Sequence, residues 1–188
     1  MRHSAREYII EAFLLLLQTV DYKKITVIMI VKKAGMNRKT FYDYFKNRED
    51  LLNQVEKEIL NEFILILGES TSEKLNQARR LIESGQPLYQ TVAVCHHIQS
   101  YLYFYKARLN DGEFIHRFTD LIYTYLYIFS CNSSISTYIS YGTIGYIKKW
   151  IDAECKEPVE SIAYGMASAT FKTLTDLNRI KETSEELF

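Results

Sequence analysis

The sequence predicts an all-α protein with an N-terminal three-helix module, which contains a helix-turn-helix, followed by a C-terminal helical bundle. Three observations predict this class. Only 7 Gly and 2 Pro occur in 188 residues, too few for a turn-rich sandwich or barrel. Apolar residues recur at helical spacing, without strand-like alternation of useful length. Residues that commonly cap helices precede most of the apolar runs.

Cap signals divide the first third of the chain into four helices. Ser4, with Glu7 three residues later, forms a capping box before the first apolar run. Thr26 and Asn37 are expected to cap two short helices, and Asn47 a long fourth helix. Each of these side chains can accept a hydrogen bond from a backbone N–H that has no partner at a helix start.

Five further helices are expected, separated by short polar breaks. The segment Leu121–Ile147 carries no charged residue, but Asn132-Ser133-Ser134 interrupts it, so two amphipathic helices fit better than one membrane span. The expected ranges are Ser72–Glu83, Leu88–Leu109, about 112 to Ser130, Asn132–Asp152, and a last helix from Pro158 with Ile162, Met166, Ala169, Thr173 and Leu177 on one stripe.

Charge is unevenly distributed along the chain. Lys plus Arg and Asp plus Glu both total 23, yet residues 1–50 hold 10 basic and 6 acidic side chains, and residues 51–188 hold 13 and 17. A basic module of net +4 therefore precedes a larger acidic part of net −4. We expect two domains, 1–50 and 51–188. Glu7 and Glu11 interrupt the only early apolar stretch, which argues against a signal peptide and for a cytoplasmic protein.

The two short helices, joined by Gly35-Met36-Asn37, form a candidate helix-turn-helix. In such a motif the start of the second helix enters the major groove, where Arg, Lys and Thr can contact base edges. Hydroxyl and ammonium groups beside it can bind phosphate, as can the start of the preceding helix. The candidate DNA-binding residues are Thr26, Asn37, Arg38, Lys39, Thr40, Tyr42, Tyr44 and Lys46.

Each of these assignments has a plainer alternative. The cations at 38 and 39 would also suit a solvated helix start, and Tyr42 and Tyr44 could pack partly into the core. Arg2, His3 and Arg6 could form a minor-groove arm or belong to a mobile tail, and the tail is favoured for Arg2 and His3.

Residues of about 4–55 resemble the DNA-binding domain of the TetR family of transcriptional regulators. The similarity is carried by Ile25-Thr26-Val27, by Ala34-Gly35-Met36-Asn37-Arg38-Lys39-Thr40-Phe41-Tyr42, and by Tyr44-Phe45-Lys46-Asn47-Arg48-Glu49-Asp50-Leu51-Leu52. Ile30-Val31 and Tyr44 depart from the usual pattern without removing a polar contact. The resemblance implies a homodimer, a palindromic operator in double-stranded DNA, and a C-terminal domain that senses a signal.

The C-terminal half is similar to regulators of the dihydroxyacetone-kinase-operon type, through Tyr141-Gly142-x-x-Gly145-x-Ile147-x-x-Trp150 followed by Pro158. The family dimerises through its last two long helices. The resemblance therefore places a dimer interface at Gly142, Gly145, Tyr146, Trp150, Ile162 and Met166. Packing of the same residues within one subunit is an equal alternative.

Other candidate sites are weaker. Cys95-His96-His97 suggests a metal ligand set, but adjacent helical residues point in different directions, and His116 stands apart. The aromatic residues 101–105 could line a ligand pocket or form core. The three cysteines, at 95, 131 and 155, suit reduced thiols. No Gly-rich phosphate loop, GxSxG or HExxH motif occurs, so we expect neither an enzyme nor a cofactor.

The sequence thus predicts a DNA-binding transcriptional regulator, in the first place a repressor, that a small-molecule effector or a partner protein modulates. Two alternatives stay open. One is an activator that depends on a partner protein and takes no small molecule. The other is a helical adaptor that has lost DNA binding.

Overall fold

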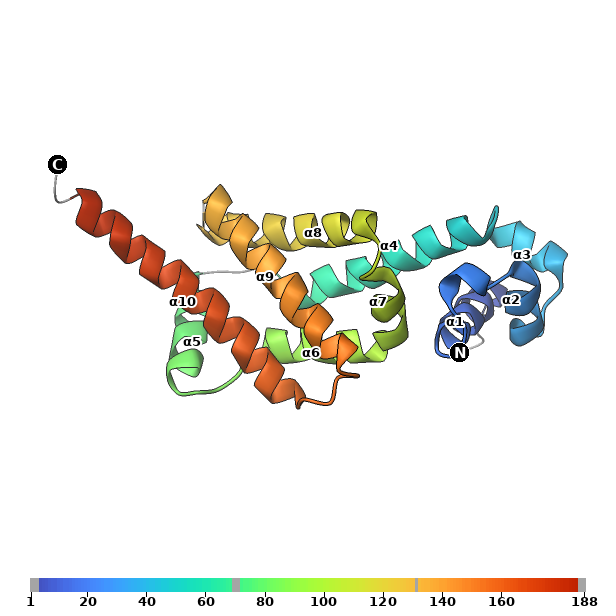
Figure 1. Cartoon of the computed structure of the whole chain (residues 1–188), viewed down its shortest axis with the longest axis horizontal. Coiled ribbons are helices and arrows are strands. Elements are labelled where there is room, and N and C mark those ends of the chain that lie inside the picture. The colour runs from blue at the N-terminus through green and yellow to red at the C-terminus, as the bar shows by residue number, and fades with distance from the viewer. Residues whose placement is uncertain (1–3, 69–71, 131, 186–188) are drawn as a thin grey trace.

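The computed structural model describes residues 4–68, 72–130 and 132–185, and within these ranges the chain is helical throughout, without strands (Figure 1). Three short helices come first: α1 (Ala5–Leu17), α2 (Val27–Ala34) and α3 (Arg38–Tyr44), with a 3₁₀ turn, η1 (Tyr22–Lys24), before α2. The others are α4 (Arg48–Leu67), α5 (Ser72–Glu83), α6 (Tyr89–Ser100), α7 (Leu102–Arg108), α8 (Gly112–Ser130), α9 (Ser133–Asp152) and α10 (Val159–Glu185).

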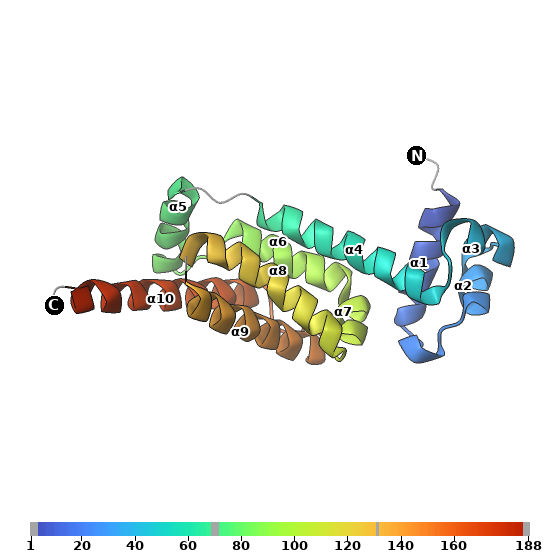
Figure 2. The same cartoon turned by 90° about the horizontal axis from the view of Figure 1, so that it is seen from above.

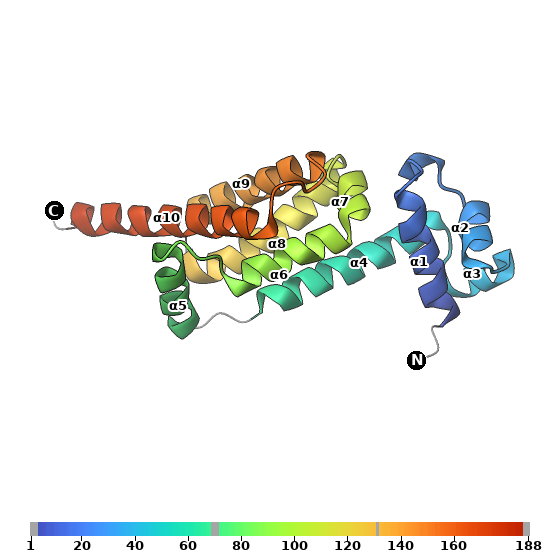
Figure 3. The ribbon, with the colours of Figure 1, turned by 90° about the horizontal axis from the view of Figure 1, so that it is seen from below.

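The molecule is elongated, with α1–α3 forming a head at one end (Figure 2). Helix α4 leaves the head and runs into a body built from α5–α10. The end of α10 projects beyond the other helices on the side away from the head (Figure 3). Because α1 also contacts α7, the head meets the body at a second place besides α4.

The expected caps all form. Ser4 and Glu7 make a reciprocal capping box, with Ser4 N–H donating to Glu7 Oε2 at 2.7 Å. The Asn47 side chain accepts from the Asp50 N–H at 2.8 Å, and the Asn132 side chain accepts from the Ile135 N–H at 3.0 Å. These bonds satisfy donors that a helix start leaves without an intrahelical partner.

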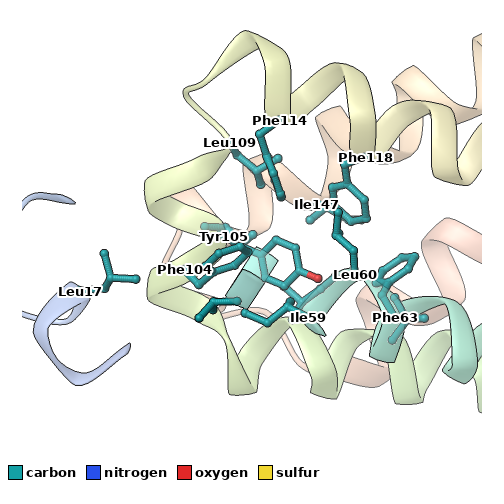
Figure 4. Close-up of a cluster of buried hydrophobic side chains, with 14 of the residues drawn as sticks. Leu17, Ile59, Leu60, Phe63, Phe104, Tyr105, Leu109, Phe114, Phe118 and Ile147 are labelled. Carbon is teal, nitrogen blue, oxygen red and sulfur yellow. The ribbon is translucent and has the colours of Figure 1, made fainter. Parts of the chain in front are cut away.

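One buried apolar cluster runs from the head into the body. Figure 4 shows its central part, where Phe104 and Tyr105 of α7 are turned toward α4 and α8. Phe114 and Phe118 of α8 complete an aromatic group, with the Tyr105 and Phe118 rings 5.6 Å apart. Leu17 of α1 belongs to the same cluster, so the head and body share a core.

The expectation of one helix from Leu88 to Leu109 is wrong. The chain breaks at Tyr101, whose φ of −111° and ψ of 27° end α6 and begin α7. The Tyr101 hydroxyl donates to Glu62 of α4 at 2.9 Å, and the change of direction brings Phe104 and Tyr105 into the core. Tertiary contacts therefore override the helical propensity of this segment, which has no Gly or Pro to interrupt it.

Of the described members of the stripe expected on the last helix, the first two are correct. Ile162 and Met166 are buried, but Ala169 is exposed and Thr173 is half-buried. The buried side continues instead through Ala163 and Ala167, as the helical period dictates on a broad packed face. The side chain of Leu177 lies outside the described ones. In the described residues, no helix is long and apolar enough to cross a bilayer.

Candidate nucleic-acid interface

Helices α2 and α3 are joined by a tight turn that depends on Gly35. Its φ of 66° and ψ of 28° lie in the left-handed region, which glycine adopts without steric cost. The Met36 N–H donates to the Val31 carbonyl at 2.9 Å, closing the end of α2. Asn37 then caps α3, with its Oδ1 accepting from the Thr40 N–H at 2.9 Å. The predicted helix-turn-helix is present.

The apolar side of α3 fixes the helix in the head. Phe41 and Phe45 are fully buried, and their rings lie 5.6 Å apart. The polar side therefore cannot rotate inward without exposing two aromatic rings, which bury a large apolar area. This packing holds the first turn of α3 at the surface of the head.

Most of the predicted DNA-binding side chains are exposed on the head. Seven of the eight side chains are exposed and Thr40 is half-buried. They belong to the start of α2, the turn, α3 and the residues just after it. The seven are Thr26, Asn37, Arg38, Lys39, Tyr42, Tyr44 and Lys46.

Four of the eight candidate side chains already pair with one another within the head. The Arg38 guanidinium donates to the Tyr42 hydroxyl at 3.3 Å and lies 5.9 Å from the centre of its ring. The Thr40 hydroxyl donates to Asn37 Oδ1 at 3.2 Å, so it is engaged in the helix cap. A Thr40 contact with a base would use its methyl group or require this hydroxyl to turn.

Arg48 anchors the head to α4, a role that the sequence did not reveal. Its Nη1 donates to the carbonyl oxygens of Tyr22, Lys23 and Ile25 at 3.2, 3.3 and 2.8 Å. Its guanidinium also lies 4.6 Å from the centre of the Tyr22 ring. The partners are at least 23 residues away, so only the fold shows them. The first turn of α4 thereby holds the connector before α2.

Arg6 is also tied down. Its guanidinium bonds to Gln54 and Glu58 of α4 and lies 5.6 Å from the centre of the Phe45 ring. These contacts assign Arg6 to the junction of α1, α3 and α4. Arg2 and His3, the other members of the candidate arm, lie outside the described residues.

A buried ionic cluster joins α4 to the body. Glu56 accepts from Arg108 of α7 (Nε to Oε2, 3.1 Å) and from Arg117 of α8 (Nη2 to Oε1, 2.6 Å). Arg108 also bonds to Asp111 at 3.1 Å. The Glu56 and Arg108 side chains are only 7% and 9% exposed. Hydrogen bonding to Glu56 raises the pKa of Arg117 above its ordinary value. The cluster binds three helices where α4 enters the body.

The six residues assigned to a dimer interface fall into two groups. Trp150, Ile162 and Met166 are buried within the subunit, and Trp150 Nε1 donates to the Glu157 carbonyl at 3.0 Å. Tyr146 is half-buried and packs on α10, where its hydroxyl would lie 2.6 Å from a side chain added at Gly165. Packing within one subunit therefore accounts for these four residues.

Gly142 and Gly145 form the second group. Both are exposed on α9, and a Cβ added to either would meet nothing within 4 Å. The exposed rings of Tyr138 and Tyr141 lie on the same helix, 74% and 53% exposed. This part of α9 has open space for another chain.

The histidines at 96 and 97 point to different surroundings. His96 is exposed, whereas His97 is buried with its Nε2 3.0 Å from the Tyr105 hydroxyl. Burial lowers the pKa of His97 below its ordinary value, although Glu62 opposes the shift. Cys95 is a buried free thiol whose pKa burial raises to about 12. Cys131 lies outside the described residues. Within the residues that the structure describes, no three His, Cys, Asp or Glu side chains could jointly hold a metal ion.

An apolar cavity of about 190 Å³ lies between the body helices. Phe63 and Leu67 from the end of α4 contribute to its wall, together with residues of α5, α6, α8, α9 and α10. No residue of the run 101–105 lines it; Phe104 and Tyr105 are core instead. The cavity thus touches the same helix that carries the head.

A family model described as "Bacterial regulatory proteins, tetR family" matches residues 9–55, which include α2, the turn and α3. Residues 9–55 therefore form an N-terminal domain of the TetR type. A curated relative, the "HTH-type dhaKLM operon transcriptional activator DhaS" of Lactococcus lactis subsp. lactis (strain IL1403), is 30% identical over 94 residues. That match covers 47% of this chain and 49% of DhaS, so it spans about half the length of this relative.

Solved structures share the TetR-like architecture. "Dihydroxyacetone kinase operon activator DhaS" superposes with a TM-score of 0.62 at 20% identity, over 94% of this chain and 97% of that one. A TetR regulator from Streptococcus agalactiae 2603V gives 0.63 at 20% identity, over 88% and 93%. FadR from Bacillus subtilis in complex with stearoyl-CoA gives 0.60 at 18% identity, over 89% and 96%. At these identities the similarity establishes the fold.

Proposed function

We propose that this protein is a cytoplasmic transcriptional regulator of the TetR family, in the first place a repressor, whose homodimer binds a palindromic operator. The observation that carries the proposal is the exposed cationic start of α3, held in place by Phe41 and Phe45 in a matching family domain. Each subunit inserts α3 into a major groove, and the two grooves lie about 34–36 Å apart.

Residues 1–50 would bind DNA and residues 51–188 would sense the signal and dimerise. Exposed Gly142 and Gly145 would let a second α9 approach closely, as small residues allow between helices. Such an interface would sit beside the buried residues Trp150, Ile162 and Met166, which support it from within the subunit.

A signal would reach the head through α4. A ligand in the apolar cavity touches Phe63 and Leu67 at one end of this helix, while Arg48 holds the head at its other end. Movement of α4 in both subunits would change the spacing of the two α3 helices. A coupling of about 1–3 kcal/mol would weaken operator binding by about 5–150-fold.

A second candidate is a transcriptional activator, which the similarity to the activator DhaS favours. DNA recognition would be the same, but a partner protein could replace the small molecule as the signal. A pull-down from lysate, compared with a thermal-shift screen of metabolites, distinguishes the two kinds of signal.

The decisive experiment is selection of genomic DNA fragments by the purified full-length protein. We expect enriched fragments to share a site with two-fold symmetry, and retention to weaken steeply as salt rises. Fragments without a shared site, together with no retention on duplex DNA at low salt, would favour an adaptor that has lost DNA binding.

A further inference from the structure

The lining of the cavity restricts the chemistry of its ligand. Among the described residues that line it, every side chain is uncharged, and its polar residues, such as Thr143 and Thr170, are neutral. An ionised group placed there would lose its hydration without gaining a counter-charge, at a high cost in free energy. The wall therefore selects uncharged, largely apolar molecules.

The size of the cavity restricts the ligand further. An apolar protein cavity of about 150 Å³ stays dry and accepts benzene, so the 190 Å³ here, in a pocket that is partly open to solvent, accommodates one aromatic ring with a short substituent. The stearoyl chain bound by FadR of Bacillus subtilis has far more carbon atoms than one ring.

We infer that the effector of this protein is a small, uncharged, apolar molecule about the size of a monocyclic aromatic ring, and that a long acyl-CoA is excluded. The regulatory role of this ligand rests on the proposed function, whereas its binding site is inferred from the cavity alone. The ligand would contact Phe63 and Leu67 of α4 on one side and Met166 of α10 on the other.

The test is calorimetric titration of the full-length protein with benzene, toluene, ethylbenzene and butylbenzene. Each added methylene that finds room should raise affinity about fourfold, and affinity should fall once the substituent exceeds the cavity. We expect a maximum at toluene or ethylbenzene and no competition between decanoyl-CoA and toluene. Absence of binding by the whole series, or displacement of toluene by decanoyl-CoA, would overturn the inference.

Two threonines on α10 provide a matched pair of variants. Thr170 lines the cavity, whereas Thr173 lies outside it with its hydroxyl donating to the Ala169 carbonyl at 2.9 Å. Thr170→Leu should fill part of the cavity and weaken toluene binding at least tenfold, and Thr173→Leu should leave it unchanged. Thermal unfolding shows whether each variant is folded. Equal loss in both folded variants would contradict binding in this cavity.

Operator binding separates this inference from the proposed function. A protein that selects a symmetric DNA site but binds no alkylbenzene would remain a regulator, and the inference would fail. A protein that binds toluene in the cavity but does not bind duplex DNA would keep the ligand class, and the proposed function would fail.

Discussion

The two lysines at the start and just beyond the end of α3 are both exposed, and in the proposed complex they would occupy different positions relative to a major groove. Lys39 lies in the first turn, which would face base edges in the proposed complex, whereas Lys46 lies beyond the helix and would sit beside the DNA backbone. The same substitution at the two positions should therefore have different consequences.

Lys39→Ala should weaken operator binding by about 1–3 kcal/mol and relax sequence preference at one base pair. Lys46→Ala, the matched control, should weaken all sequences alike and reduce the salt slope by about 1. Competition binding with operator and scrambled duplexes at several salt concentrations measures both effects. Unchanged operator affinity in Lys39→Ala would show that α3 is not placed in the groove as proposed.

His97 predicts a pH dependence of stability. Because burial lowers its pKa in the folded protein, the unfolded chain takes up this proton first as pH falls. The free energy of unfolding should therefore decrease below about pH 6.5, the ordinary histidine value. The nearby Tyr101 and Tyr105 have raised pKa values through burial and stay neutral in this range.

Denaturant unfolding between pH 5 and 7 tests this dependence, with His97→Gln as the variant. The lowered pKa values of Asp50 and Asp111 affect stability at more acidic pH, as the pH falls through those values. We expect His97→Gln to reduce the slope between pH 5 and 6.5. An equal slope in both proteins would assign it to other groups.

Local residue roles could be predicted from the sequence, and distant ones could not. The caps at Ser4, Thr26 and Asn37 depend on partners within three residues, so a short pattern reveals them. Arg48 and Glu56 have partners more than twenty residues away in the sequence, and a short sequence pattern cannot reveal such partners. Their roles required the fold.

At the scale of elements, charged side chains hold α4 at its first residue and near its middle. Arg48 bonds to backbone carbonyls of the head, and Glu56 bonds to arginines of α7 and α8. Removing one member of a buried ion pair leaves the other without compensation, which makes such pairs sensitive to substitution.

Glu56→Ala should lower the free energy of unfolding by about 3 kcal/mol, the lower end for a broken buried pair, because Asp111 still pairs with Arg108. Glu113→Ala removes an exposed partner of Arg117 at 3.7 Å and should cost at most about 1 kcal/mol. Denaturant unfolding of the two variants gives the comparison. Equal, small losses would mean that the cluster contributes little to the position of α4.

The helices themselves were predicted more accurately than their breaks. Ser84-Gly85-Gln86-Pro87 lies between α5 and α6, and Asn132 of the second polar break caps α9, so both breaks mark helix boundaries in the structure. The break at Tyr101 has no such signal, because it results from packing of Phe104 and Tyr105 against α4 and α8. A helix boundary that results from core packing can be located only once the packing of the core is known.

At the scale of the whole molecule, the family match and the helical periodicity lead to the same all-α architecture, with a head at one end and a body behind it. Trp150 and Ile162 are buried within one subunit, so the candidate dimer contacts are the exposed residues of α9. The glycines of α9 indicated from the sequence that this helix could form an interface, but the sequence did not show which of its residues are buried and which are exposed.

Gly142→Arg should shift the protein from dimer to monomer and lower operator affinity, because a long charged side chain would occupy the proposed contact. Gly112→Arg is the matched control, since Gly112 is also exposed in a helix with open space around it. Sedimentation at several protein concentrations measures the association. A stable dimer in both variants would place the interface on another surface.

The grip of Arg48 on the connector has a practical consequence for hybrid regulators. If the head of this protein were transplanted and cut after residue 47, it would lose the Arg48 guanidinium. That group binds the carbonyls of Tyr22, Lys23 and Ile25. The splice must therefore fall later in the sequence, so that the donor protein contributes its own arginine along with the segment that this arginine secures.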